Sequence, residues 1–144
     1  MELLEAYQLA CRLHTGQVDK AGRPYIEHLT RFYLRVLAAG GDRSQLMAAL
    51  LHDSIEDGKV SEAQLRWLGV PAAAVTLVVV LTKLKSQSYE VYLELVKRNP
   101  AALLVKLEDV NDNIDPERLA ELPAAEADRL RTKYQRARDF LASA

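Results

Sequence analysis

An apolar run that ends in charge lies near the middle of the chain: Leu46-Met47-Ala48-Ala49-Leu50-Leu51, followed directly by His52-Asp53-Ser54-Ile55-Glu56-Asp57. The first six residues are apolar on every face of a helix, which predicts a helix in the core. The next six hold one imidazole and three carboxylates, and burying an unpaired carboxylate costs several kcal/mol. No Lys or Arg lies between Arg43 and Lys59. Positive charge must therefore come from elsewhere, and a divalent metal ion would supply it, unless these groups lie at the surface.

Helical spacing limits how this stretch can bind an ion. His52 and Asp53 point about 100° apart on a helix, so they can share one ion only near their common edge. Glu56 and Asp57 each follow one of that pair by one turn. The alternative is a solvated helix end with an acidic turn after it, although carboxylates at a helix C-terminus oppose the helix dipole. A metal or catalytic site and a solvated acidic turn both remain open on this chemistry alone.

Turn residues divide the rest of the chain into helix-sized segments without visible partner strands, which predicts an all-α, compact helical bundle. The segment 72–82 is ambiguous because its Thr-Leu-Val-Val-Val-Leu run has strand propensity. Its alanines, its length and Pro71 as the first helical residue favour a central helix. We expect helices at about residues 2–14, 25–39, 44–55, 61–69, 72–82, 88–98, 100–113 and 124–142, with a short turn from Pro116.

Composition limits the class of protein. The 144 residues suit a single domain, 1–144. The single Cys11 excludes an internally disulfide-stapled scaffold, and 19 basic against 20 acidic residues exclude a nucleic-acid partner held by net charge. No signal peptide or membrane-spanning segment is visible, so we expect a cytoplasmic protein without a membrane partner. The sequence does not identify protein partners.

A second acidic cluster follows another apolar run, Leu103-Leu104-Val105-Lys106-Leu107, and reads Glu108-Asp109-Val110-Asn111-Asp112-Asn113. Asp109 and Asn113 share a helix face, with Lys106 one turn earlier. The alternative is a polar helix end with capping side chains. His28 is a further candidate, although a lone histidine on an amphipathic helix is more often structural. His14 is expected to anchor the loop at 15–24.

Three segments, in order and spacing, resemble the HD-domain hydrolases of the RelA/SpoT type. His14-x-Gly16-Gln17 with Asp19 to His28 is similar to the opening of that family. Leu50 to Asp57 is similar to its His-Asp doublet with the following Glu-Asp, and Val105 to Asn113 to its third motif. The similarity extends over about residues 5–142.

This resemblance implies a helical enzyme that uses Mn²⁺ to remove pyrophosphate from the 3′ position of guanosine tetra- or pentaphosphate (ppGpp or pppGpp). It implies that His28, His52, Asp53 and Asp109 are metal ligands, and that Glu56 and Asp57 are the acid/base pair. Lys20 and Asn113 would contact the nucleotide, and Arg23 and Lys106 lie near the same motifs, where phosphates would need them. A mixed nitrogen and oxygen ligand set suits Mn²⁺ or a similar ion. Such an ion acidifies water, and a nearby carboxylate manages the proton.

Departures from the family pattern bear on the substrate. Asp19 stands where many relatives have a basic residue, Leu29 replaces a usual Pro, and Gly58 a common Thr. The third motif reads Val110-Asn111-Asp112-Asn113 instead of Arg-x-His-Asn. Two alternatives therefore stay open: the same chemistry on another nucleotide or phosphoester, and a non-catalytic HD module that binds a nucleotide or a protein. The intact Glu56 and Asp57 favour an enzyme.

Overall fold

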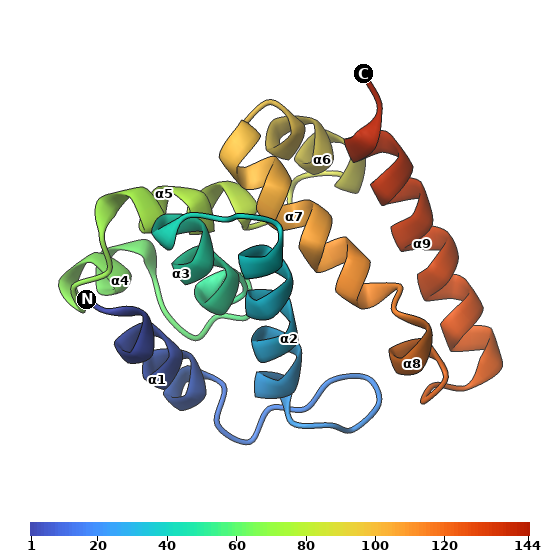
Figure 1. Ribbon diagram of the computed structural model, residues 1–144, viewed down its shortest axis with the longest axis horizontal. Coiled ribbons are helices and arrows are strands. Elements are labelled where there is room, and N and C mark those ends of the chain that lie inside the picture. Colours follow the sequence, from blue (N-terminus) through green and yellow to red (C-terminus); the bar gives the residue numbers. More distant parts are fainter.

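The computed structural model describes all 144 residues and contains nine helices and no β-sheet, which confirms the predicted all-α bundle (Figure 1). In chain order the helices are α1 (Leu3–Leu13), α2 (Tyr25–Ala38), α3 (Arg43–Leu51), α4 (Glu62–Trp67), α5 (Ala72–Leu81), α6 (Tyr89–Lys97), α7 (Pro100–Asn113), α8 (Pro116–Leu119) and α9 (Ala124–Ala142).

The core is built around α3, which packs against α1, α2, α5 and α7. Every residue of α3 from Gln45 to Leu51 is buried, as expected for a helix that is apolar on all sides. The ambiguous segment is helical, as predicted, and forms α5. Pro71 was predicted to be its first helical residue, but it is the N-cap residue, one position earlier. Helix α7 lies between α2 and α9 and contacts both, so it connects the core to the C-terminal helix (Figure 1).

Side-chain caps fix where four of the helices begin. Asp42, Ser61, Ser88 and Asn99 each accept a hydrogen bond from the backbone N–H three residues further on. A cap of this kind stabilises a helix by about 1 kcal/mol. The caps therefore set the helix starts close to the positions predicted from the sequence.

Helix α3 ends earlier than predicted, at Leu51 and not at Ile55. The backbone N–H of Ser54 bonds to the Leu51 carbonyl at 3.0 Å, and the Ser54 hydroxyl bonds to the same oxygen at 2.6 Å. A serine that satisfies a local carbonyl in this way competes with the helical ladder. Residues 52–58 consequently form turns. Their carboxylates bind donors from three different segments, namely Tyr25 for Asp53, Lys83 for Glu56 and Gln17 for Asp57.

Helix α9, predicted at 124–142, packs inward through one apolar face. Ala127, Leu130, Ala137 and Leu141 are buried, and α9 lies along α7 (Figure 1). None of the nine helices has both the length and the apolar composition needed to cross a lipid bilayer.

Candidate active site

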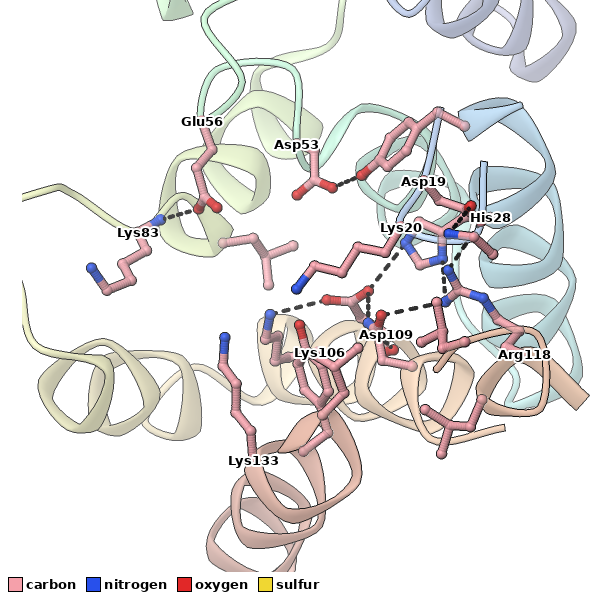
Figure 2. A pocket seen from close by; sticks show the side chains of 18 of the residues that line it. Asp19, Lys20, His28, Asp53, Glu56, Lys83, Lys106, Asp109, Arg118 and Lys133 are labelled. Atoms are coloured by element: carbon pink, nitrogen blue, oxygen red, sulfur yellow. Dashed lines mark hydrogen bonds and ion pairs between the residues drawn. The ribbon is translucent and has the colours of Figure 1, made fainter. Parts of the chain in front are cut away.

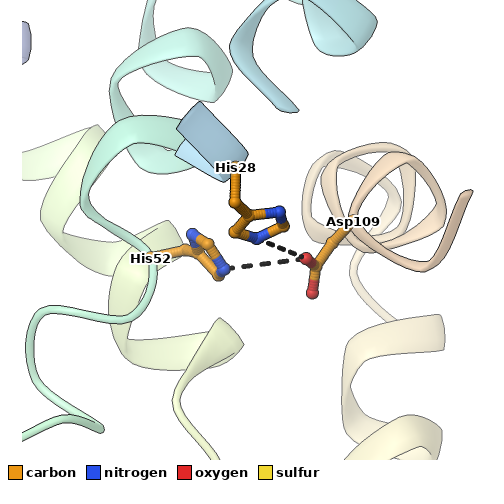
Figure 3. Close-up of side chains that lie close together, drawn as sticks. All are labelled: His28, His52 and Asp109. Carbon is orange, nitrogen blue, oxygen red and sulfur yellow. Dashed lines mark ion pairs between the residues drawn. The ribbon is translucent and has the colours of Figure 1, made fainter. Parts of the chain in front are cut away.

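Three helices bring together a buried group of possible metal ligands (Figure 3). His28 comes from α2, His52 is the residue that follows α3, and Asp109 comes from α7. One ligand atom from each lies within 4.8 Å of the others. Asp109 Oδ1 is 3.4 Å from His28 Nε2 and 3.8 Å from His52 Nε2.

Hydrogen bonds on the far side of each ring turn the same nitrogen of both histidines toward Asp109. His52 Nδ1 lies 3.0 Å from the carbonyl oxygen of Ala49, which can only accept, so Nδ1 carries the hydrogen. His28 Nδ1 lies 2.6 Å from a carboxylate oxygen of Asp112. Metal-binding histidines are commonly oriented by such bonds, which leave Nε2 free to coordinate. The donor set therefore fits a divalent cation, with positions left for water or substrate.

The protonation of the two histidines also fits a cation. Burial, together with the positive charges of His28 and Lys106, lowers the pKa of His52 to about 4, so this ring is neutral and able to coordinate at neutral pH. Burial lowers the pKa of His28 as well, but its hydrogen bonds with Asp109 and Asp112 outweigh that effect and raise it. A metal ion between His28 and Asp109 would take the place of the proton held there.

Asp53, the fourth predicted ligand, lies beside this group but outside it. Its Oδ1 is 3.0 Å from His52 Nε2, and its Oδ2 accepts a hydrogen bond from the Tyr25 hydroxyl. Burial and the neighbouring carboxylates of Asp109, Asp57 and Glu56 raise its pKa well above the usual value. Negative charge thus accumulates around Asp53, and a cation would relieve it.

The side chains of Glu56 and Asp57, which the family resemblance implied to be an acid/base pair, lie in different surroundings. Glu56 lines the cavity beside the metal ligands and accepts a 2.7 Å hydrogen bond from the backbone N–H of Lys83. Asp57 lies outside the residues that line this cavity and accepts a 3.0 Å hydrogen bond from the side-chain amide of Gln17. Gln17 in turn contacts the buried His14 at 2.7 Å, so His14 anchors the loop as predicted.

The cavity has a volume of about 640 Å³, within the range of small-molecule binding sites. Five basic side chains line it: Lys20, Lys83, Lys106, Arg118 and Lys133. Figure 2 shows the ammonium groups of Lys20, Lys106 and Lys133 directed into the space that Asp53 and Asp109 also border. Cations and metal ligands on one cavity suit an anionic ligand such as a phosphate ester.

Three of the four predicted substrate-binding residues line the cavity, namely Lys20, Lys106 and Asn113. Lys106 Nζ lies 3.0 Å from Asp109 Oδ2, and the negative charge of Asp109 outweighs burial and raises the pKa of Lys106. Asn113 donates to the backbone carbonyl of Asp109 at 2.9 Å. Arg23 does not line the cavity; it is exposed and bonded to Glu27 at 2.6 Å. Glu27 follows Arg23 by four residues, a spacing at which oppositely charged side chains commonly pair. A role for Arg23 in substrate binding stays a prediction.

Sequence reasoning missed several residues of the cavity, among them Arg118 and Lys133. Lys133 Nζ lies 4.9 Å from the ring centre of Tyr89 and 5.1 Å from that of Tyr134. Burial and the nearby charges of Lys20 and Lys106 lower its pKa. The available signal was the row of basic residues beside the apolar stripe of the last helix, which did not indicate a shared site with residues far away in sequence.

The profile of one protein family, described as HD domain, matches residues 6–101, which include His28, His52, Asp53 and Glu56. This chain belongs to the HD domain family. Asp109 and the residues of α9 follow the matched segment, so the candidate site also uses residues beyond it.

Relatives of this HD domain carry related names. The guanosine-3′,5′-bis(diphosphate) 3′-pyrophosphohydrolase of Aquifex aeolicus is 34% identical over 78% of this chain and 17% of its own length. The GTP pyrophosphokinase of Streptomyces coelicolor is 33% identical over 75% of this chain and 14% of its own length. The chain thus spans less than a fifth of these relatives. A solved structure described as a metazoan ortholog of SpoT that hydrolyzes ppGpp superimposes with a TM-score of 0.78, at 26% identity, over 98% of this chain and 85% of that one.

Proposed function

We propose that this HD domain hydrolyses the 3′-pyrophosphate of ppGpp or pppGpp, with Mn²⁺ as the metal and in the cytoplasm. The observation that carries the proposal is the single cavity in which His28 and Asp109 meet Lys20, Lys106 and Lys133. Metal ligands alone would suit many reactions, and cations alone would suit simple phosphate binding. Their combination, together with the names of the relatives, supports hydrolysis of a highly charged nucleotide.

His28, His52 and Asp109 would hold the metal, with Asp53 next to them. When bound, the metal supplies an acidified water molecule and neutralises charge on the phosphate. In the reaction, the water oxygen bonds to the phosphorus next to the ribose, the bond from that phosphorus to the ribose 3′ oxygen breaks with the ribose oxygen as leaving group, and pyrophosphate is released with the water oxygen in it. Glu56 faces the cavity and takes the proton from the water, and a proton is returned to the ribose oxygen.

Lysines on opposite sides of the cavity would bind the phosphates. Lys20 lies in the loop before α2, and Lys133 lies on α9. Lys106 is already paired with Asp109, whereas Lys133 makes no ion pair and rests on two tyrosine rings. An ammonium group without a carboxylate partner retains its charge for a ligand.

The test is a hydrolysis screen with purified protein and added Mn²⁺, in which ppGpp, pppGpp and other nucleoside polyphosphates are separated by anion-exchange chromatography. We expect pyrophosphate release from ppGpp. His52→Ala should lose both Mn²⁺ binding and turnover, whereas Glu56→Ala should keep Mn²⁺ and lose turnover by about 10²- to 10⁴-fold. Asp57→Asn serves as the matched control, because its carboxylate lies outside the cavity and a smaller loss is expected.

Several results would contradict the proposal. Full activity of Glu56→Ala would remove the role assigned to that carboxylate. Turnover of another phosphoester in place of ppGpp would retain the chemistry and replace the substrate. Failure to hydrolyse any nucleotide, with tight nucleotide binding, would favour a binding module.

A further inference from the structure

Asp112 is one of the departures from the family pattern, because the RelA/SpoT-type motif usually has histidine at this position. From its place in the third motif, we expected this change to affect the choice of substrate. In the structure its side chain is fully buried, it does not line the cavity, and it contacts α2 and Arg118. Its effect must therefore reach the site through the residues it touches.

The shortest contact of Asp112 goes to a proposed metal ligand. Its Oδ2 lies 2.6 Å from His28 Nδ1 and 3.0 Å from Arg118 Nη1. Its Oδ1 lies 3.1 Å from Arg31 Nε and 3.4 Å from Arg35 Nε. Three arginines thus balance the charge of this buried carboxylate, and His28 completes the set.

We propose that Asp112 is a positioning residue that fixes His28 as a metal ligand by holding its Nδ1 hydrogen and turning Nε2 toward Asp109. This inference rests on the metal site of the proposed function. A carboxylate that accepts from the ring of a metal-binding histidine fixes the tautomer and makes the other nitrogen a better ligand. Aspartate in place of the family's usual histidine therefore changes the residue that orients the metal ligand His28, and not a ligand itself.

The two histidines differ in how easily this support can be removed. His52 Nδ1 is held by the backbone carbonyl of Ala49, which persists whatever side chain stands at that position. His28 Nδ1 lies 2.6 Å from the Asp112 carboxylate and 3.5 Å from Arg118 Nη1. A guanidinium can only donate, so the acceptor for the Nδ1 hydrogen is the side chain of Asp112 on α7. Asp112 and Asp109 lie on neighbouring turns of α7, so one helix supplies both the ligand and the support of the histidine opposite.

A purely structural role is the competing explanation, because Asp112 also joins α7 to the arginines of α2. Asp115 provides a matched control. It binds the same Arg35 at 2.7 Å, lies just beyond α7, and makes no contact with His28. Asp115→Asn should weaken the ion-pair network and leave His28 unaffected.

The test measures Mn²⁺ binding by electron paramagnetic resonance, with no nucleotide present, together with the ¹⁵N chemical shifts of the His28 ring in metal-free protein. Because the pKa of His28 is raised, the spectra are recorded at a pH above it, where the ring is neutral and wild type should show the Nδ1–H tautomer. Asp112→Ala should show a mixture of tautomers and bind Mn²⁺ about 10- to 100-fold more weakly. Asp112→Asn keeps an acceptor oxygen without the charge, and should retain the tautomer and lose less affinity than Asp112→Ala. Asp115→Asn should match wild type in both measurements.

Unchanged Mn²⁺ affinity and an unchanged tautomer in Asp112→Ala would overturn the proposal, as would an equal loss of affinity in Asp115→Asn. If Asp112→Ala does not fold, Asp112→Asn decides: a Mn²⁺ affinity equal to wild type in the folded protein would overturn the proposal, because the carboxylate is what makes Nε2 the better ligand. Because no nucleotide is used, a failure to hydrolyse ppGpp would leave this result standing.

Discussion

The two acidic clusters of the site differ in the groups that face them. The first cluster (Asp53, Glu56 and Asp57) lies in the turns after α3 and accepts hydrogen bonds from neutral donors. These donors are the Tyr25 hydroxyl, the backbone N–H of Lys83 and the side-chain amide of Gln17. Three carboxylates on or just after α7, Asp109, Asp112 and Asp115, form the second cluster as the structure shows it, and they face cations. These cations are Lys106, His28, Arg31, Arg35 and Arg118. Glu108 is not part of the second cluster, since it accepts from the neutral Asn111 side chain.

The electrostatic consequences are opposite. Burial raises the pKa of Asp53, and neighbouring carboxylates raise it further. Burial also acts on Asp109 and Asp112, but Lys106, the histidines and the arginines outweigh it and lower their pKa values. The second cluster is therefore a charge-balanced framework, and the first is the part of the site where an added cation would gain most. The residues around α7 thus hold the ligands in place, whereas the turns after α3 supply the negative charge that a cation would neutralise.

The largest effect is expected where the balance of the second cluster is broken. Lys106→Met keeps most of the side-chain volume but leaves the buried Asp109 without its closest cation. Removing one partner of a buried ion pair typically costs about 3–5 kcal/mol. Urea unfolding in the presence of EDTA should show a loss of this size. Lys133→Met removes a cavity lysine without an ion pair and should change stability far less; equal losses in both variants would contradict the comparison.

A cation should act mainly through the first cluster. At a Mn²⁺ concentration a hundred times its Kd, we expect stabilisation by about 2.7 kcal/mol, a rise in Tm of roughly 5–10 °C over the same protein in EDTA. Asp53→Asn removes a carboxylate that forms no ion pair with a Lys or Arg and whose pKa is raised by burial and by neighbouring carboxylates. In EDTA at neutral pH it should therefore be at least as stable as wild type. Its gain from Mn²⁺ should be smaller. Differential scanning calorimetry measures both, and a destabilised metal-free variant would show that Asp53 is already balanced.

The smallest effect is a pH dependence of opposite sign in the two clusters. The pKa of Asp112 is lowered in the folded protein, so its contribution is complete above the unfolded pKa of about 3.9 and is lost as the pH falls through the folded value. Asp112→Asn should therefore cost about 2 kcal/mol at pH 7 and progressively less below pH 4. Asp53, with its raised pKa, should make wild type gain stability relative to Asp53→Asn as the pH falls. Urea unfolding across pH 3–7 in EDTA compares the slopes, and slopes of the same sign would contradict the assignment.

Much of the fold was predictable because local signals agree with the tertiary structure. Asn99 and Pro100 mark the start of α7. Apolar residues spaced three or four apart mark the inward face of α9. The end of α3 was not predictable in this way, because the hydroxyl of Ser54 competes with a helical hydrogen bond that the composition favours. The predicted end of α3 was therefore wrong at a point where one side chain, that of Ser54, decides between a helix and a turn.

The site divides along similar lines. His28, His52 and Asp109 were predicted from motifs and are brought together by three helices. The position of Lys133 was not predictable, because it depends on how α9 lies against α7. The role of Asp112 was hidden for the same reason: its partners on α2 lie roughly 80 residues away in sequence, and no local pattern connects them.

The distribution of the site along the chain also has a consequence for its biosynthesis. The proposed metal ligands lie between residues 28 and 109, whereas Lys133 belongs to α9, which follows them. All the proposed ligands therefore precede α9 in the order of synthesis, and the side of the cavity that α9 supplies is the last part of the site to be made.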